Sequence, residues 1–181
     1  MDESQILRDM QRRIANLIRR GRVHSVDFSQ TPPRVRVEYV PDATTGWLPW
    51  IGGRASSASR TDWEPLSVGE QCVILAQSGD LNSGVVVPAM LDSQNPPPST
   101  SPDEHMTKYA DGTVILYSRA THQLTVNVNG GDIHIKTTAN VNVDAKNIKL
   151  NNGAGVVTTA HICAFTGNAH EDGSSTVFAG K

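Results

Sequence analysis

The sequence predicts a mainly β protein, in which an N-terminal helix precedes an OB-like barrel and a β-helix needle intertwined from several copies. Three observations lead to this prediction. Apolar residues recur at helical spacing near the N-terminus, short alternating segments follow, and pairs of apolar residues then repeat every seven or eight positions. Helices and half-buried strands produce these two kinds of period.

The first element, residues 1–21, is expected to be the helix. One side carries an apolar stripe at spacings of three and four, the other side is mostly charged, and Gly21 is expected to end the helix. The stripe comprises Ile6, Leu7, Met10, Ile14, Leu17 and Ile18. Such a stripe is expected to dock on a partner subunit or on other copies of this chain.

The second element, residues 22–92, is expected to be the OB-like barrel, because five short strands joined by loops are typical of that architecture. The predicted strands cover residues 23–28, 34–40, 47–51, 70–77 and 84–90. Val35 and Val37 alternate with arginines and should face the core. Cys72 lies in an apolar run and is expected to be a reduced core thiol.

A proline-rich stretch at residues 93–102 divides the barrel from the needle. Its four prolines prevent regular strand pairing and favour an extended, stiff linker. Beyond it, Asp111-Gly112 precedes a run of apolar residues and predicts a hairpin. The needle should therefore begin with a conventional strand pair.

The needle itself is expected over residues 103–160. Its inward row comprises Leu124, Val126 and Val128, then Ile133 and Ile135, then Val141 and Val143, and then Ile148 and Leu150. Strands this short cannot bury a core within one chain. Several copies must therefore close around a common axis. His134 lies between two inward residues and is expected to face outward.

The tip is expected at residues 161–181, where the inward row continues with His161 and Cys163 and is followed by His170. If three chains share the axis, three copies of each side chain meet there, which is enough for a six-coordinate metal. Imidazole and thiolate suit iron or zinc. In the alternative interpretation, His161 faces water, Cys163 is a small buried filler and His170 is a loop residue.

Several function classes are not expected. The sequence has no phosphate loop, nucleophile elbow or His-Glu-x-x-His motif, and its carboxylates are scattered, so we expect no enzymatic activity. The formal charge of −2 gives no electrostatic basis for nucleic-acid binding. The apolar stretches are shorter than a membrane span and the N-terminus does not resemble a signal peptide, so assembly in a cytoplasm is expected.

The sequence resembles the baseplate assembly protein V family of contractile phage tails, which is related to the central spikes of R-type pyocins. The motifs that carry the resemblance are Trp47-Leu48-Pro49-Trp50, Gly52-Gly53-Arg54-Ala55, the run from Arg60 to Gln71, Gly79-Asp80-Leu81, the run from Val85 to Pro88, the run from Asp111 to Tyr117, and the closing Gly-Ser-Ser-Thr near residue 173.

The resemblance implies a homotrimer with an OB domain, a triple-stranded β-helix and a pointed apex that pierces the outer membrane of the target cell. It also implies a place in the tail baseplate of a virion or pyocin, in contact with the baseplate hub and other tail proteins, after assembly in the host bacterial cytoplasm. Some relatives hold iron at the tip through a His-x-His motif. This chain has His161-x-Cys163 instead, so its ligand set differs.

Two functions therefore compete. The first is a trimeric, membrane-piercing central spike without enzymatic activity. The second is an OB-fold module that binds glycan or nucleic acid and is trimerised by a β-tail. The first is favoured because the repeats continue towards the C-terminus and a histidine and a cysteine follow them, which a tail used only for trimerisation does not require.

Overall fold

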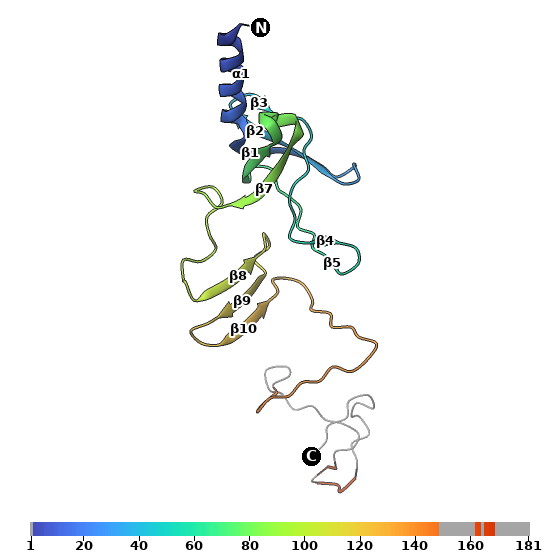
Figure 1. Ribbon diagram of the computed structural model, residues 1–181. Coiled ribbons are helices and arrows are strands. Elements are labelled where there is room, and N and C mark those ends of the chain that lie inside the picture. Colours follow the sequence, from blue (N-terminus) through green and yellow to red (C-terminus); the bar gives the residue numbers. More distant parts are fainter. Residues whose placement is uncertain (1, 149–161, 164, 169–181) are drawn as a thin grey trace. The chain divides into compact units, whose positions relative to one another are not determined.

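The computed structural model describes residues 2–148, 162, 163 and 165–168, which divide between two units, Met1–Gly131 and Asp132–Lys181 (Figure 1). The first unit is mainly β, as predicted, with one N-terminal helix. Its elements are α1 (Glu3–Asn16), β1 (Ile18–Asp27), β2 (Arg34–Val40), β3 (Ala43–Thr44), β4 (Ala55–Ser56), β5 (Arg60–Thr61), β6 (Gln71–Ala76), short 3₁₀ helices at Gln77–Gly79 and Leu81–Ser83, β7 (Gly84–Met90), β8 (Glu104–Lys108), β9 (Val114–Ser118) and β10 (Gln123–Asn127). Within the described residues, no helix has the length and apolar character needed to cross a membrane.

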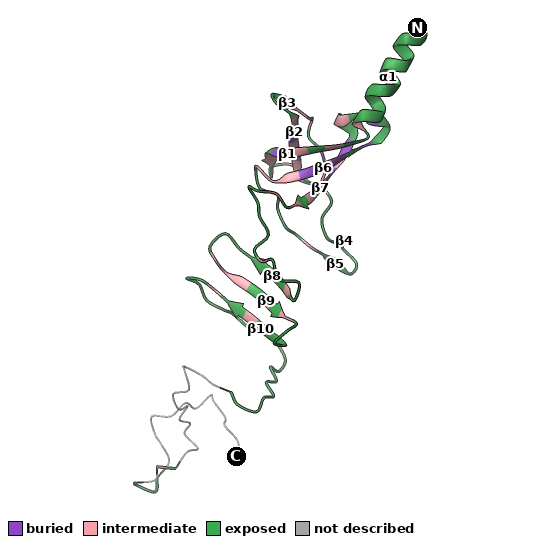
Figure 2. Cartoon of the chain, turned by 90° about the vertical axis from the view of Figure 1, so that its left-hand side faces the viewer, coloured by how far each residue is buried: buried purple, intermediate pink, exposed green. Residues whose placement is uncertain are grey.

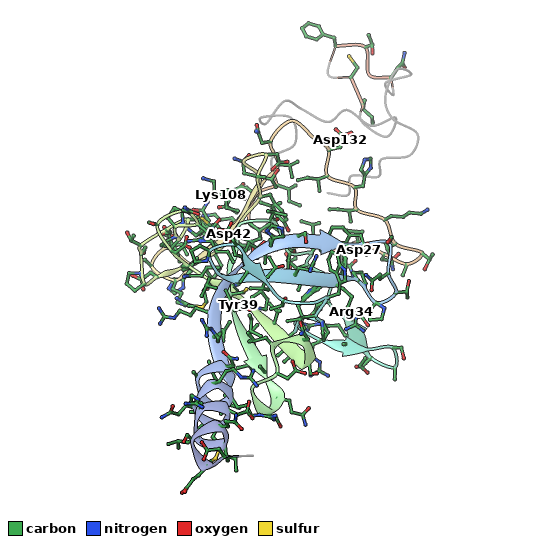
Figure 3. The ribbon with its side chains drawn as sticks, turned by 90° about the horizontal axis from the view of Figure 1, so that it is seen from above. Asp27, Arg34, Tyr39, Asp42, Lys108 and Asp132 are labelled. Atoms are coloured by element: carbon green, nitrogen blue, oxygen red, sulfur yellow. The ribbon has the colours of Figure 1, made fainter. Side chains whose placement is uncertain are left out.

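The barrel is built on a five-stranded antiparallel sheet with the strand order β3-β2-β1-β6-β7. Strand β2 has the predicted bounds, Arg34–Val40. Figure 3 shows the barrel from above, with Asp27 and Arg34 where β1 passes into β2 and with Tyr39 and Asp42 towards the other end of β2. The alternating pattern locates this strand correctly because only one of its faces meets the core.

The buried core of the described residues lies inside this barrel. Within the described part of the chain, all the buried residues, purple in Figure 2, belong to the barrel. The buried apolar cluster comprises Val23, Val35, Val37, Leu48, Leu66, Cys72, Ile74, Ala76 and Val86. The predicted inward positions of Val35 and Val37 are confirmed, and so is the prediction that Cys72 is a free, buried thiol.

The segment at residues 47–51 closes the barrel, although it is not the regular strand that was predicted. Leu48 bridges Val35 of β2 in an antiparallel sense, and Trp50 bridges Val86 of β7 in a parallel sense. Because β2 and β7 lie towards opposite ends of the sheet, these two bridges join its ends. Pro49 has no amide hydrogen, so the segment changes partner instead of extending one ladder. The fifth strand of the sheet is β3 instead.

The helix is shorter than predicted, and Gly21 does not end it. Helix α1 ends at Asn16, and β1 begins at Ile18, which pairs with Leu75 of β6. Ile18 continues the helical period but belongs to a strand, because tertiary contacts override local propensity. Gly21 lies inside β1, where an added Cβ would overlap the side chain of Val37. Its role is to allow β2 to approach closely.

Strands β8, β9 and β10 form a separate three-stranded antiparallel sheet. The predicted hairpin is confirmed: Gly112 has a φ of 90°, and the amide of Thr113 donates to the Asp111 carboxylate over 2.8 Å. Leu124 and Val126, the start of the repeating row, belong to β10 of this sheet. Residues 128–148, all of them described, contain no strand in the single chain, so the β-helix stays a prediction.

The proline-rich segment begins at an ion pair on the barrel. The guanidinium of Arg22 donates to the carboxylate of Asp92, which also accepts the amides of Gln94 and Asn95 over 2.9 and 2.7 Å. The amide of Asn95 and then the Arg22 guanidinium lower the pKa of Asp92. The three prolines that follow, residues 96–98, are exposed. The segment therefore leaves the barrel from a defined point.

Candidate functional site

An apolar patch of β9 and β10, on one face of the three-stranded sheet, is the candidate site of self-association. The β8 residues on the same face, His105 and Thr107, are polar. The pairing register places Val126 opposite Ile115 and Leu124 opposite Tyr117, so the four side chains share one face. Leu124 is 67% exposed and Val126 50% exposed in the single chain. Contiguous apolar surface on a soluble protein marks an interface. The sequence identified Leu124 and Val126, whereas Ile115 and Tyr117 joined them only through the register.

The other face of this sheet is different in composition. It mixes the apolar Met106, Val114 and Leu116 with polar and charged residues, among them Thr125, Asn127, Glu104 and Lys108. Successive residues of a strand point to opposite faces. Val126 and Asn127 are therefore neighbours in sequence that belong to the apolar face and to the mixed face, respectively.

The apolar row that the sequence predicts continues beyond this sheet. Beyond the half-buried Val128, its described members are all exposed in the single chain: Ile133, Ile135, Val141, Val143 and Ile148. Such short segments have no buried face of their own to pack on. His134, the residue predicted to face outward, is 87% exposed, and its ring lies 3.9 Å from the carboxylate of Asp132. The inward register of this row stays a prediction.

Of the three predicted metal ligands, the structure describes Cys163, whereas His161 and His170 lie outside the described residues. Cys163 begins a tight turn. Its amide donates to the carbonyl oxygen of Asn168 over 2.8 Å, and the amide of Gly167 donates to the carbonyl oxygen of Cys163 over 2.9 Å.

The same turn favours the thiolate form of Cys163. Hydrogen bonds from the side chain and backbone of Thr166, and then from the backbone of Phe165, lower the pKa of the Cys163 thiol. The thiolate is the form that binds metals. In the part of the chain that the structure describes, no three metal-binding side chains come together. The chemistry of Cys163 fits a metal, and the complete ligand set stays a prediction.

The apolar stripe of α1 is a second exposed surface. No residue of the helix is buried, as its green and pink colour in Figure 2 shows. Ile6, Leu7, Met10 and Ile14 are all exposed. On the polar side, Asp9 pairs with two arginines of the following turn. The helix thus exposes an apolar stripe, while Asp9, Arg12 and Arg13 on its polar side pair with one another.

An aromatic groove on the barrel was not predicted from the sequence. It has a volume of about 300 Å³, and its lining includes Pro32, Pro33, Pro49, Trp50 and Trp63. We call it the Trp63 groove. Its aromatic pair comes from two segments separated by the β4–β5 hairpin. In the sequence, the motif that surrounds Trp63 indicates only the family resemblance, because the sequence does not show which residues the hairpin brings together.

Comparisons with known proteins agree with this architecture. Residues 19–91 match the family described as the Type VI secretion system/phage-baseplate injector OB domain. Over 120 residues, the chain is 38% identical to the Spike protein of Escherichia phage P2, and this alignment covers 66% of the chain and 54% of that protein. The chain therefore spans about half the length of the curated relative that it matches.

Proposed function

We propose that this chain, which is similar to a phage baseplate spike protein, forms the homotrimeric central spike of a contractile tail. The tail is that of a phage or of an R-type pyocin, and the spike lies at the centre of its baseplate. When the sheath contracts, the spike pierces the outer membrane of the target cell mechanically.

The apolar face of the three-stranded sheet carries this proposal. Ile115, Tyr117, Leu124 and Val126 form one patch that the single chain leaves in water. Complete burial of one such aliphatic side chain stabilises by about 1.5–3 kcal/mol. A cyclic assembly buries the same patch on every copy. Three sheets that turn this face towards a common axis therefore form the first layer of the needle core.

The repeating row extends this core along the axis. Residues 128–148 find their strand partners in the neighbouring copies and form the triple-stranded β-helix, with the pairs from Ile133 to Ile148 inside. Because all the backbone pairing at this level is between chains, the fold of the needle and its trimerisation are one event. This explains why the single chain has an exposed apolar row but no strand in this region.

The N-terminal helix connects the spike to the rest of the baseplate. Its apolar stripe is exposed, and it docks on the baseplate hub or another tail protein. The barrel stands between this helix and the needle along the chain. Force from the contracting sheath therefore reaches the needle through folded protein.

Piercing requires stiffness and a small cross-section instead of a chemical step. The sheath supplies the work, and the intertwined strands resist bending because each is paired on both sides. No residue is assigned a catalytic role. This proposal is supported by the short apolar pairs that repeat in the C-terminal third of the sequence and by the similarity to a phage spike protein.

The most detailed part of the proposal is a metal ion at the apex. His161 and Cys163, with His170 as the alternative ligand, hold iron or zinc where three chain ends meet. The lowered pKa of Cys163 supports a thiolate ligand. The metal joins the three ends and removes the cost of burying unpaired polar side chains.

The trimer is tested by a matched pair of substitutions in β10. Val126→Asp places a carboxylate on the apolar face, whereas Asn127→Asp places one on the mixed face of the same strand. The molar mass of wild type and of both variants is measured by light scattering. We expect three chains for the wild type and for Asn127→Asp, and loss of the trimer for Val126→Asp. A wild type of single-chain mass would refute the spike.

A further inference from the structure

We propose that the Trp63 groove of one copy binds the proline-rich segment, residues 93–102, of a second copy. This inference rests on the proposed trimer and adds a contact outside the needle. It links the barrel of each copy to the linker of its neighbour, so that the barrels form a ring and do not swing independently above the needle.

The first step concerns the aromatic side chains of the groove. The ring centroid of Trp63 lies 5.9 Å from that of Trp50 and 6.5 Å from that of Phe28, in a tilted and an edge-on arrangement. Trp63 is nevertheless 59% exposed. The ring is thus held in place by two aromatic neighbours while much of its surface stays open. A fixed, open indole on a soluble protein is typical of a binding surface.

The second step concerns the class of ligand. Prolines line the groove beside the two tryptophans. Grooves lined by aromatic rings bind polyproline II segments, which lose little entropy because they are already extended. The ionic lining consists of Arg54, Asp62 and Glu64, and Asp62 is paired with Arg60 through two contacts of 2.7 Å. The groove therefore has no excess positive charge for a phosphate, and it suits an uncharged, proline-rich segment.

The third step identifies the occupant. Residues 93–102 contain no charged residue and include three consecutive prolines, enough for one full turn of polyproline II. Residues 96–98 are exposed in the single chain, and none of residues 93–102 lines the groove of its own copy. The ion pair between Arg22 and Asp92 fixes the point at which the segment leaves the barrel. Because the segment does not line the groove of its own copy, we assign it to the groove of a neighbouring copy in the proposed trimer.

The first test compares two tryptophans of the full chain. In the single chain, Trp63 is 59% exposed and Trp47, which does not line the groove, 42% exposed. Exposure alone therefore predicts faster oxidation of Trp63 by limiting N-bromosuccinimide, as followed by peptide mass mapping. We expect the reverse order in wild type, and the loss of this protection in the triple variant Pro96→Ala, Pro97→Ala and Pro98→Ala. Pro102→Ala is the matched control and should keep the protection.

The second test is a cross-link that reports which copy supplies the segment. In a Cys163→Ser background, Ala55→Cys at the groove is combined with Pro97→Cys, and the oxidised protein is examined on a denaturing gel without reductant. Cys72 is fully buried and does not interfere. We expect covalent dimers and trimers. The control pair Val40→Cys with Pro97→Cys, which joins the segment to the far end of β2, should give none.

The outcomes separate this inference from the proposed function. One outcome is a trimer by light scattering in which no cross-link forms and Trp63 is oxidised as fast in wild type as in the triple variant. That result overturns the inference and leaves the proposed spike intact. A cross-link found within one chain by peptide mapping overturns the assignment to a second copy. A single-chain mass overturns both.

Discussion

Gly79 packs directly against Arg13, so that a Cβ atom added to Gly79 would overlap the backbone carbonyl of Arg13. Gly79 belongs to the 3₁₀ helix that follows β6, and Arg13 to the last turn of α1. The amide of Ala76 also donates to the carbonyl oxygen of Leu17 over 2.9 Å. The base of the helix is thus joined to the barrel by a close backbone contact at Gly79 that a residue with a Cβ atom would prevent, and by the hydrogen bond between Ala76 and Leu17.

Gly79→Ala should therefore destabilise the junction between helix and barrel. The residue has a φ of 72°, which costs about 1–2 kcal/mol for a residue with a Cβ, and the overlap with Arg13 adds to this cost. Gly69→Ala is the control, because Gly69 also has a positive φ but an added Cβ there would meet nothing within 4 Å. Urea unfolding should show a larger loss for Gly79→Ala. Equal losses would mean that the contact with α1 contributes nothing.

Val143→Asp should dissociate the needle, because three carboxylates would then face the axis, and an unpaired charge is costly to bury. His134→Ala should leave the trimer unchanged, since His134 is 87% exposed. The measurement is the resistance of the trimer to sodium dodecyl sulfate on an unheated gel. A resistant Val143→Asp trimer would show that the inward register is wrong.

Deletion of residues 2–15 should leave the trimer intact and abolish its incorporation into tails, because this deletion removes the four stripe residues that α1 carries, Ile6, Leu7, Met10 and Ile14, and stops before β1. Deletion of residues 2–20 removes in addition the pairing partners of Val73, Ile74 and Leu75. The longer deletion should therefore also lower the stability of the barrel. Both are assayed by light scattering and by complementation of tails that lack the spike. If tails that contain the shorter deletion were active, docking would have to be assigned to the barrel instead of the helix.

Purified trimer should contain about one transition-metal ion per three chains, as six converging ligands imply. His161→Ala combined with Cys163→Ala should abolish the metal but keep the trimer, because the apolar rows still hold it. Metal content is measured by plasma mass spectrometry. If the metal survives this double change and disappears with His170→Ala, the ligand set is wrong. A wild type without metal would mean that the tip is closed by packing alone.

The barrel should lose stability between about pH 9 and pH 11 through Cys72. Burial, and to a lesser degree the charge of Glu70, raises the pKa of this thiol from 9.0 to about 11. Above pH 9 the unfolded chain releases the Cys72 proton while the folded chain retains it, so rising pH favours unfolding. Urea unfolding of wild type and Cys72→Ala across this range isolates the effect, because only wild type has this contribution. Parallel pH profiles of the two proteins would contradict it.

The sequence alone was sufficient for elements whose structure is decided locally. Strand β2 was predicted with its observed bounds because valines and charged residues alternate along it. The turn at Asp111-Gly112 was predicted because few residues accept the positive φ that Gly112 adopts. Cys72 was placed in the core because it lies in an apolar run. In each case, the physical cause lies within a few residues of the feature.

Features decided by contacts between distant segments were not predictable in this way. Residues 17–20 continue the helical period, yet Ile18 joins β1 because it pairs with Leu75. This partner lies 57 positions away in the chain, so the local sequence does not reveal it. Trp50 and Trp63 form a groove only because the hairpin between them folds back. Ile115 meets Val126 only through the register of β9 and β10.

The candidate interface shows the same division. The sequence by itself determined that an apolar row exists and that one chain cannot bury it, since both follow from period and strand length. Only the tertiary structure decided that the row begins as one strand of a three-stranded sheet, and which residues complete its face. The reason is physical: a side chain's direction depends on its own strand, whereas its neighbours depend on strands that pair across loops.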